Sequence, residues 1–360
     1  MRIGIEVSTA CLREPTGVAH YARCLAEAHA AAFPDDQLEL LVRLSRWRRR
    51  AYLQNPANLP VRIYHGPWLR SPWLRPELVH GTEAWLPPWK EPARVVTVHD
   101  LAVLRFDEEW FAPAAFRARK RRAYEQLRDA ADLVIVPSEV TRQDLLELFG
   151  YDPGRVHVIP HGIEARWRRD AMADPAVLMR HGLEPGFVLF VGRISARKNV
   201  VRAIEAFARS PGARERMLVL AGPMAVGGEL VNEAIGRLGL ANRVLLPGFC
   251  NDEEIEALYR AAGTLLFPTF YEGFGLPILE AMACGLPVVA GSRGSAPEVA
   301  AGHAEIADPM DVDAIAAALD RALAMGAERR AAAIAHARGF TWERTAGATR
   351  AVYAEALAGR

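Results

Sequence analysis

The sequence predicts an α/β protein with two doubly wound domains, each built on a parallel sheet. Three observations predict this class. Short apolar runs alternate with amphipathic stretches along most of the 360 residues, the runs are almost continuously apolar, and the pattern occurs twice around a polar, Arg-rich stretch at 161–185. Strands that are covered by helices on both faces have continuous apolar sequences. A chain of this length is sufficient for two domains of ordinary size.

In the first half, the apolar run at 3–7 predicts the opening strand, and a period of 3.6 predicts a helix at 18–32. The further strands are expected at 38–42, 61–64, 78–80, 95–99, 133–137 and 156–159, and the further helices at 113–130 and 140–149. Helices between successive strands return the chain to the same edge of a sheet, so the strands are expected to pair in parallel.

The second half repeats this pattern. Strands are expected at 187–191, 217–221, 244–246, 265–268 and 288–290, and helices at 200–209, 229–236, 252–262 and 277–283. After Asp308 the sequence is typical of helices to its end, and a last helix is expected at 342–360. We therefore predict an N-terminal domain at 1–165 and a C-terminal domain at 166–341.

The composition excludes several classes of protein. With 51% hydrophobic and 24% charged residues, the chain is typical of a soluble globular protein, and a net charge of +1 argues against a nucleic-acid partner held by bulk charge. The four cysteines have no CxxC spacing, so neither a disulfide framework nor a zinc site is expected, and free thiols suit a reducing cytoplasm. The start, MRIGIEV, is interpreted as a strand rather than a signal peptide. No apolar run approaches the roughly 20 residues that span a bilayer.

The most informative segment is FPTFYEGFGLPILEAMACGLPVVAG, at 267–291. Glu272 and Glu280 flank a Gly-rich turn that leads into a helix, which Pro277 is expected to open and Gly285 to close. The turn consists of Gly273, Phe274, Gly275 and Leu276. Such a turn offers free backbone N–H groups and a positive dipole end to a phosphate, and carboxylates beside it suit hydroxyl groups that flank the phosphate. A nucleotide sugar has this chemistry, although an ordinary β-turn-α-β unit with two surface glutamates has the same pattern.

The Glu-x7-Glu spacing around this turn resembles the donor-site signature of family 4 retaining glycosyltransferases, which have the GT-B fold. The resemblance implies two Rossmann-like domains that face a central cleft, with the helix at 342–360 packing back on the N-terminal, acceptor-binding domain. It implies that Glu272 holds hydroxyls of the transferred sugar and that Glu280 holds the ribose. The turn from Gly273 to Leu276 would then bind the donor.

Two cations follow the first strand of the second domain, in the run VGRISARKNV. An arginine can hold a diphosphate in a bidentate manner and a lysine adds a point charge, but a solvated surface pair is the ordinary interpretation. The run resembles the Gly-Arg and Lys-Asn elements of the same family. That resemblance implies that Arg193 and Lys198 bind the leaving diphosphate and stabilise its charge.

Three segments of the first half also resemble family elements. Gly17, in EPTGVAHY, lies in the loop after the first strand, where the family brings backbone close to donor phosphates and acceptor; an ordinary βα turn is the alternative. His99, in TVHDL, is either structural or, by resemblance, a catalytic-site residue facing the transferred sugar, and Asp100 would support it. His161, in VIPHGI, would line the cleft or brace the hinge. There is no G-x-G-x-x-G for a dinucleotide.

A D-x-D sequence, Asp311 to Asp313, is formally a metal-binding signature. Acidic residues at the start of a helix are explained by capping and by the helix dipole, so no metal cofactor is expected. Pyridoxal phosphate is not expected either, because Lys198, the best candidate lysine, is already assigned to phosphate.

Two basic runs, at 43–50 and 117–122, belong to the first half. Among prolines between them lie the tryptophans Trp68, Trp73, Trp85 and Trp89. These features indicate either solvated helix faces with a packed loop, or a surface that docks on anionic lipid. The second interpretation suits family members whose acceptors are lipid-linked saccharides.

Together these features predict a metal-independent, retaining hexosyltransferase of polysaccharide assembly, cytoplasmic or peripheral on the inner face of the cytoplasmic membrane. The motifs most resemble bacterial mannosyl- and rhamnosyltransferases, so GDP-mannose or a related GDP-deoxyhexose is the expected donor, with UDP- and dTDP-sugars as alternatives. The acceptor is expected to be a saccharide or lipid-linked saccharide. A nucleotide-sugar epimerase or phosphorylase on the same architecture, and a non-catalytic sugar-binding protein, remain alternatives.

Overall fold

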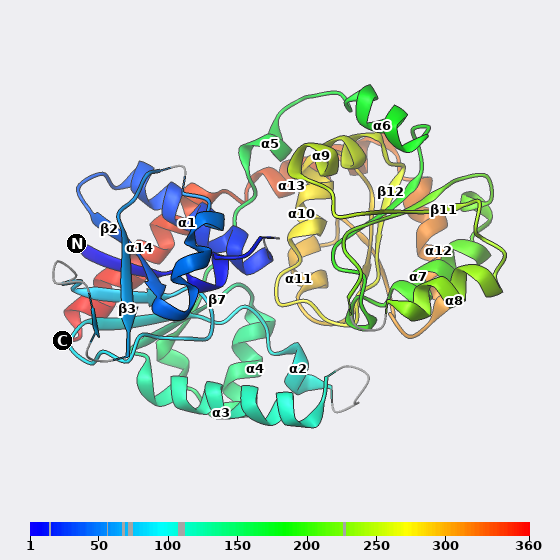
Figure 1. Ribbon diagram of the computed structural model, residues 1–360. Helices are drawn as coiled ribbons and strands as arrows, with labels where there is room; N and C mark the ends of the chain where they lie inside the picture. The colour runs from blue at the N-terminus through cyan, green and yellow to red at the C-terminus, as the bar shows by residue number, and fades with distance from the viewer. Residues whose placement is uncertain (14–15, 56, 67–68, 71–74, 107–111, 226–227) are drawn as a thin grey trace. The chain divides into compact units, whose positions relative to one another are not determined.

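The computed structural model describes the chain except for residues 14–15, 56, 67–68, 71–74, 107–111 and 226–227. The chain divides into two compact units, each of which holds one sheet with its helices (Figure 1). The first unit comprises Met1–Arg105, Ala114–Gly162 and Thr341–Arg360, and the second is built around Ile163–Phe340.

The first unit contains an eight-stranded sheet in the order β4-β3-β2-β1-β5-β6-β7-β8. Its strands are β1 (Arg2–Glu6), β2 (Gln37–Arg43), β3 (Val61–His65), β4 (Leu69–Arg70), β5 (Leu78–Gly81), β6 (Ala93–Thr97), β7 (Leu133–Val136) and β8 (Val156–Val158). All neighbouring strands pair in parallel except β3 and β4, so the sequence-based prediction holds apart from this two-residue antiparallel edge.

Helices cover both faces of this sheet. They are η1 (Ser8–Ala10), α1 (Gly17–Ala32), η2 (Leu44–Tyr52), α2 (Ala102–Arg105), α3 (Ala114–Ala130), α4 (Glu139–Phe149), η3 (Pro153–Arg155) and α14 (Trp342–Ala358). Val95 and Ile135 pack into one core, whereas their neighbours Val96 and Val134 pack into another on the opposite face. This alternation explains why the strands are continuously apolar.

The last helix, α14, packs on α1 within the first unit (Figure 1). Tyr21 and Leu25 of α1 form a buried cluster with Trp342 of α14. Arg350 of α14 donates to Asp36, 2.8 Å away, and the buried His29 of α1 lies 3.0 Å from the same carboxylate. Asp36 therefore links α14 to α1, and its cationic and hydrogen-bonding partners hold its pKa well below the ordinary range despite burial, which acts in the opposite direction.

The second unit contains a six-stranded, entirely parallel sheet in the order β11-β10-β9-β12-β13-β14. Its strands are β9 (Val188–Val191), β10 (Leu218–Ala221), β11 (Val244–Gly248), β12 (Thr264–Phe267), β13 (Val288–Gly291) and β14 (Glu305–Ala307). Its helices are α5 (Ala165–Arg168), α6 (Pro175–His181), η4 (Ala196–Lys198), α7 (Val200–Arg209), η5 (Pro211–Ala213), α8 (Glu229–Arg237), α9 (Asp252–Ala261), α10 (Leu276–Ala283), α11 (Ala296–Ala300), α12 (Val312–Leu323) and α13 (Ala327–Arg338).

Both sheets reverse their strand order at one point, and this confirms the predicted doubly wound architecture. In the second unit the reversal falls between β9 and β12, and in the first unit between β1 and β5. In open α/β sheets the loops that leave the carboxyl ends of the strands diverge at such a point, and ligands bind there. The residues that follow β9 and β12 are therefore expected to line a ligand site.

Candidate active site

Two residues from the predicted donor site meet where the second sheet reverses. Lys198, in the short helix η4 after β9, donates a hydrogen bond of 2.7 Å to Oε1 of Glu272, which follows β12. The Lys198 ammonium also lies 4.8 Å from the centre of the Phe267 ring. Both side chains are about nine-tenths buried. The structure therefore joins a cation and a carboxylate that are 74 residues apart in sequence.

The backbone of Glu272 is fixed by the turn before α11. Ser295 donates its backbone N–H to the Glu272 carbonyl at 3.0 Å and its hydroxyl to the Phe274 carbonyl at 2.9 Å. A Cβ on Gly294 would lie 2.7 Å from the Glu272 carbonyl oxygen, and Gly294 also has a φ of +66°. Only glycine suits that position, so the turn is held against Glu272 by backbone rather than by side chains.

Lys198 is positioned by its neighbour Asn199. Asn199 is buried and has a φ of 58°, a left-handed conformation that asparagine tolerates better than most residues. Its side-chain amide donates to the carbonyls of Pro268, at 2.9 Å, and Pro309, at 2.7 Å. The amide therefore ties the end of η4 to the loop that carries Glu272.

The helix after the Gly-rich turn is α10. Gly275 caps it with a φ of 96°, and no side chain accepts from its first turn. The helix therefore begins at Leu276 and places Pro277 second, so the expectation that Pro277 opens the helix was wrong by one residue. The left-handed Gly275 turns the chain into the helix earlier than proline requires. At the other end Gly285 donates to Met282. This bond, with a φ of 76° at Gly285, is part of a Schellman ending.

Glu280 lies on α10 and turns toward α9. Its Oε2 accepts a hydrogen bond of 3.1 Å from the hydroxyl of Tyr259. Burial raises the pKa of Glu280 to about 7, and the Tyr259 hydrogen bond opposes this effect only partly. At neutral pH this carboxyl is therefore divided between its protonated and ionised forms.

Arg193 differs from Lys198 in that no described residue pairs with its side chain. Its side chain is exposed directly after β9, and within the described part of the chain no group forms a hydrogen bond or ion pair with it. Lys198 and Arg197, by contrast, both approach Glu272, at 2.7 and 3.7 Å. The segment that follows β9 therefore carries an exposed guanidinium at Arg193 and a buried ion pair at Lys198, and both cations are suited to an anionic ligand.

His99 lies in the first unit with both ring nitrogens engaged. Its Nε2 lies 2.7 Å from the carbonyl of Thr82, and its Nδ1 lies 3.2 Å from Nε2 of His161. A carbonyl only accepts, so Nε2 of His99 carries the proton. Burial lowers the pKa of both histidines, and in the neutral form His99 Nδ1 accepts from His161. His161 thus orients His99.

A polar network beneath His99 was not predicted. His80 lies 2.8 Å from the Thr97 hydroxyl through Nε2 and 2.6 Å from the Tyr353 hydroxyl through Nδ1. The Tyr21 hydroxyl is 2.9 Å from that of Thr97, and the Tyr21 ring packs against His99. These residues occur at core positions of strands and helices, so their spacing alone could not distinguish them from ordinary core side chains.

Gly17, predicted to approach donor phosphates, is the exposed first residue of α1. No described atom would lie within 4 Å of a Cβ added there, so steric contact within the chain does not require glycine.

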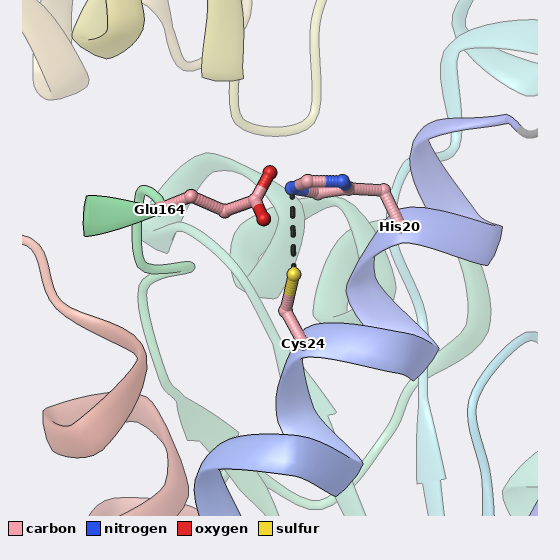
Figure 2. Close-up of side chains that lie close together, drawn as sticks. All are labelled: His20, Cys24 and Glu164. Carbon is pink, nitrogen blue, oxygen red and sulfur yellow. Dashed lines mark hydrogen bonds between the residues drawn. The ribbon is translucent and has the colours of Figure 1, made fainter. Parts of the chain in front are cut away.

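Further along α1, His20 and Cys24 lie on the same side of the helix, with Nε2 of His20 and Sγ of Cys24 3.6 Å apart (Figure 2).

Asp311 acts as a helix cap, as the sequence predicted. Its carboxylate accepts the backbone N–H groups of Asp313 and Ala314 at 3.0 Å, at the start of α12. Asp313 forms an ion pair of 2.7 Å with Arg209. The acidic residues of the D-x-D sequence are thus engaged in local structure.

The tryptophans and basic runs have mixed environments. Trp89 is buried and Trp85 is 43% exposed, whereas Trp68 and Trp73 lie outside the described residues. On α3, Arg119, Arg121 and Arg122 are exposed. Among the described residues, no helix is both long and apolar enough to cross a bilayer.

We predict that Glu280 gives the protein a distinctive pH dependence of stability. Between pH 4.5 and about 7 the folded protein keeps a proton that the unfolded chain has lost. The free energy of unfolding therefore falls as the pH rises across this range, and it levels off above pH 7. Glu280→Gln cannot ionise. Between pH 5 and 8 it should gain stability relative to wild type by on the order of 2 kcal/mol, measured by urea unfolding. The exposed Glu253→Gln is the control; equal pH dependence in all three proteins would contradict the prediction.

Comparison with known proteins gives the family. Residues 180–340 match the sequence family described as glycosyl transferases group 1, and residues 4–167 match glycosyltransferase family 4. The chain is 33% identical over 275 residues to O-antigen chain mannosyltransferase B of Escherichia coli, covering 74% of this chain and 71% of that enzyme. It is 36% identical over 251 residues to a D-inositol 3-phosphate glycosyltransferase of Streptomyces bingchenggensis, covering 65% of this chain but only 55% of that relative.

A solved structure agrees with this assignment at the level of the fold. The sucrose-phosphate synthase of Thermosynechococcus elongatus superposes with a TM-score of 0.78 at 22% identity, and the alignment covers 100% of both chains. With the family matches and the E. coli relative, the two doubly wound units identify this chain as a member of glycosyltransferase family 4 with the GT-B fold.

Proposed function

We propose that this glycosyltransferase moves a hexose from a nucleotide sugar to a saccharide or lipid-linked saccharide, with retention of configuration. The observation that supports the donor is the Lys198–Glu272 ion pair at the reversal point of the second sheet, with the Gly-rich turn that opens α10 following Glu272 in the sequence. A cation, a carboxylate and the positive end of a helix dipole are together suited to a diphosphate with hydroxyl groups next to it.

In this proposal the ion pair exchanges partners when the donor binds. The diphosphate takes the Lys198 ammonium and the exposed Arg193, and Glu272 is released to accept hydrogen bonds from the sugar hydroxyls. The two cations and the start of α10 stabilise the charge that develops on the departing diphosphate. Gly273, Phe274, Gly275 and Leu276 supply the turn around it.

Glu280 is proposed to hold the ribose. A carboxylate accepts two hydroxyl donors more readily than a protonated carboxyl group does, so ribose binding would favour the ionised form. Tyr259 already donates to Oε2 and leaves Oε1 as the acceptor for the donor molecule.

Retention is proposed to occur by attack on the face that the diphosphate leaves. A double displacement needs a carboxylate nucleophile next to the anomeric carbon, and the motif assigns Glu272 to hydroxyl binding instead. The leaving diphosphate would then accept the proton of the acceptor hydroxyl. Gly17 and His99 remain predicted contacts of phosphate and sugar; a hydrogen bond from His99 to the sugar would have to replace its bond to His161 or Thr82.

GDP-mannose, or a related GDP-deoxyhexose, is the proposed donor, supported by the mannosyltransferase named among the relatives. The test is thermal-shift titration with GDP, UDP, dTDP, ADP and their common sugar conjugates, followed by NMR of the sugar released or transferred. A shift with GDP and GDP-mannose alone supports the proposal. A shift only with UDP or dTDP contradicts the donor assignment, and no shift with any nucleotide contradicts the transferase mechanism.

We predict that Lys198→Ala weakens binding of the nucleoside diphosphate by roughly 10- to 100-fold, the usual contribution of a charge-assisted hydrogen bond. Binding of the corresponding nucleoside, which has no phosphate, should be unchanged. Isothermal titration calorimetry measures both. Equal diphosphate affinity in wild type and variant would exclude Lys198 from the phosphate site.

We propose that transfer needs no bound metal, because Asp311 already accepts two backbone N–H groups and Asp313 is paired with Arg209. Turnover measured with excess EDTA should therefore equal turnover without it. Loss of activity that Mn²⁺ restores would revive the D-x-D sequence as a metal site.

The basic side chains of α3, of which Lys120 is half-buried and the three arginines are exposed, are proposed to dock the enzyme on the inner face of the cytoplasmic membrane. Replacing Arg119, Lys120, Arg121 and Arg122 by glutamine should weaken binding to phosphatidylglycerol vesicles, measured by co-sedimentation, by up to about 1,000-fold, because each basic residue near an anionic surface contributes about 1 kcal/mol. A charge-matched control replaces four exposed arginines of the second unit, namely Arg180, Arg209, Arg214 and Arg237. Equal losses of vesicle binding in both variants would show that binding depends on net charge and not on α3.

A further inference from the structure

The carboxyl edge of the first sheet carries a cluster that the proposed donor site does not use. Glu6 ends β1, Arg43 ends β2, Tyr64 lies in β3, and Trp85 follows β5. These four strands are neighbours, and Arg43 is in register with Tyr64. Ligands bind at this edge of open α/β sheets, and the cluster lies next to the point where the first sheet reverses.

Glu6 is the buried centre of the cluster, with 1% of its surface exposed. Its Oε1 accepts from the Tyr64 hydroxyl at 2.9 Å and from the Ser8 hydroxyl. The Ser8 oxygen in turn accepts the backbone N–H of Arg43 at 2.8 Å. Burial raises the pKa of Glu6, and the Arg43 guanidinium is the largest influence that opposes this rise.

The Arg43 guanidinium is held on two sides. Its Nε lies 3.4 Å from Glu6 Oε1, and its Cζ lies 4.8 Å from the centre of the Trp85 ring. The indole is itself fixed, because Nε1 of Trp85 donates to the Tyr64 hydroxyl at 3.1 Å. Buried groups therefore orient both the guanidinium, whose side chain is 28% exposed, and the 43% exposed Trp85.

This oriented guanidinium makes no hydrogen bond with any described residue through its side chain. In the same unit Arg62 and Arg105, by contrast, donate to carboxylates. A fixed guanidinium with unused terminal nitrogens is suited to a phosphate or carboxylate, which it binds through two parallel hydrogen bonds. The helix η2 that follows adds Arg46, Arg48, Arg49 and Arg50, whose positive potential attracts an anion.

We propose that Arg43 and Trp85 form an acceptor subsite that binds a phosphate group carried by the acceptor saccharide. The inference rests on the proposed transferase function and names the chemistry of its second substrate. Arg43 binds the phosphate, and the exposed indole offers apolar surface to the sugar beside it. A neutral saccharide would offer no anionic acceptor to the terminal nitrogens of this half-buried guanidinium, so the subsite selects phosphorylated acceptors. The phosphate can belong to a soluble sugar phosphate or to the diphosphate of a lipid-linked saccharide.

The test uses the full chain saturated with GDP, so that the proposed donor phosphate site is occupied. Mannose 1-phosphate, a short-chain prenyl diphosphate saccharide and methyl α-mannoside are then titrated by calorimetry. At least one phosphorylated probe should bind, and methyl α-mannoside should not. Arg43→Gln should lose about tenfold or more of that affinity, whereas Arg49→Gln on the exposed part of η2 should keep it.

Arg43→Lys controls for misfolding. It keeps a positive charge beside Glu6 but loses the planar guanidinium that binds a phosphate through two parallel hydrogen bonds. It should retain the wild-type melting temperature and GDP affinity while losing most of the phosphate affinity. Binding of mannose 1-phosphate assigns the site to soluble sugar phosphates, and binding of the prenyl probe alone assigns it to lipid-linked ones; both support the subsite.

Two results overturn the proposal. One is phosphate-probe binding that is absent from wild type or is equal in wild type, Arg43→Gln and Arg43→Lys. The other is that Arg43→Gln loses as much affinity for phosphatidylglycerol vesicles without saccharide as it loses for the phosphorylated probes. That result would make Arg43 a lipid contact. If wild type binds neither GDP nor any other nucleotide, the proposed function is wrong. The donor titration shows this separately from any result on the acceptor subsite.

Discussion

The candidate active site depends on one interaction, the ion pair between Lys198 and Glu272. A carboxylate beside a phosphate site would repel the ligand, and an unpaired lysine in the same place would be costly to bury. Each group compensates for the other in the unliganded protein. The side chains are only 11% and 10% exposed, so desolvation cancels much of their attraction. We infer that the pair serves binding more than stability, because a diphosphate can replace the carboxylate as the partner of Lys198.

The surrounding backbone would allow the proposed exchange of partners without a large rearrangement. Asn199 holds the lysine end of η4 by two hydrogen bonds to carbonyls, and Ser295 with Gly294 holds the backbone of Glu272. Neither support uses the charged atoms themselves. The side chains can therefore change partners while their Cα positions stay fixed, which is the preorganisation that transition-state stabilisation requires.

The sequence was sufficient for the fold class because continuous apolar runs are a strong signal for strands covered on both faces. It did not predict β4 or β14, because neither segment lies in a continuous apolar run. It placed the start of α10 one residue late, because a left-handed Gly275 was not distinguishable from an ordinary turn glycine. The motif identified Lys198 and Glu272 separately, but only the structure shows their contact.

The role proposed for Arg43 also could not be predicted from the sequence. In the sequence it is one of five arginines in a basic run and has no distinguishing mark. In the structure it is held by Glu6 and Trp85, which are far from it in the sequence. His99 likewise was recognised by its motif, whereas its engagement with Thr82 and His161 depends on tertiary packing.

The most direct test of the central claim is the turnover of Glu272→Ala with the donor that the nucleotide titrations identify. The variant should keep its fold and bind the nucleoside diphosphate at least as well as wild type, because Lys198 no longer has a competing carboxylate. Sugar transfer should fall by about 100-fold or more, since the hydroxyl contacts that orient the sugar are lost. Turnover equal to wild type would contradict the assignment of Glu272 to the donor sugar.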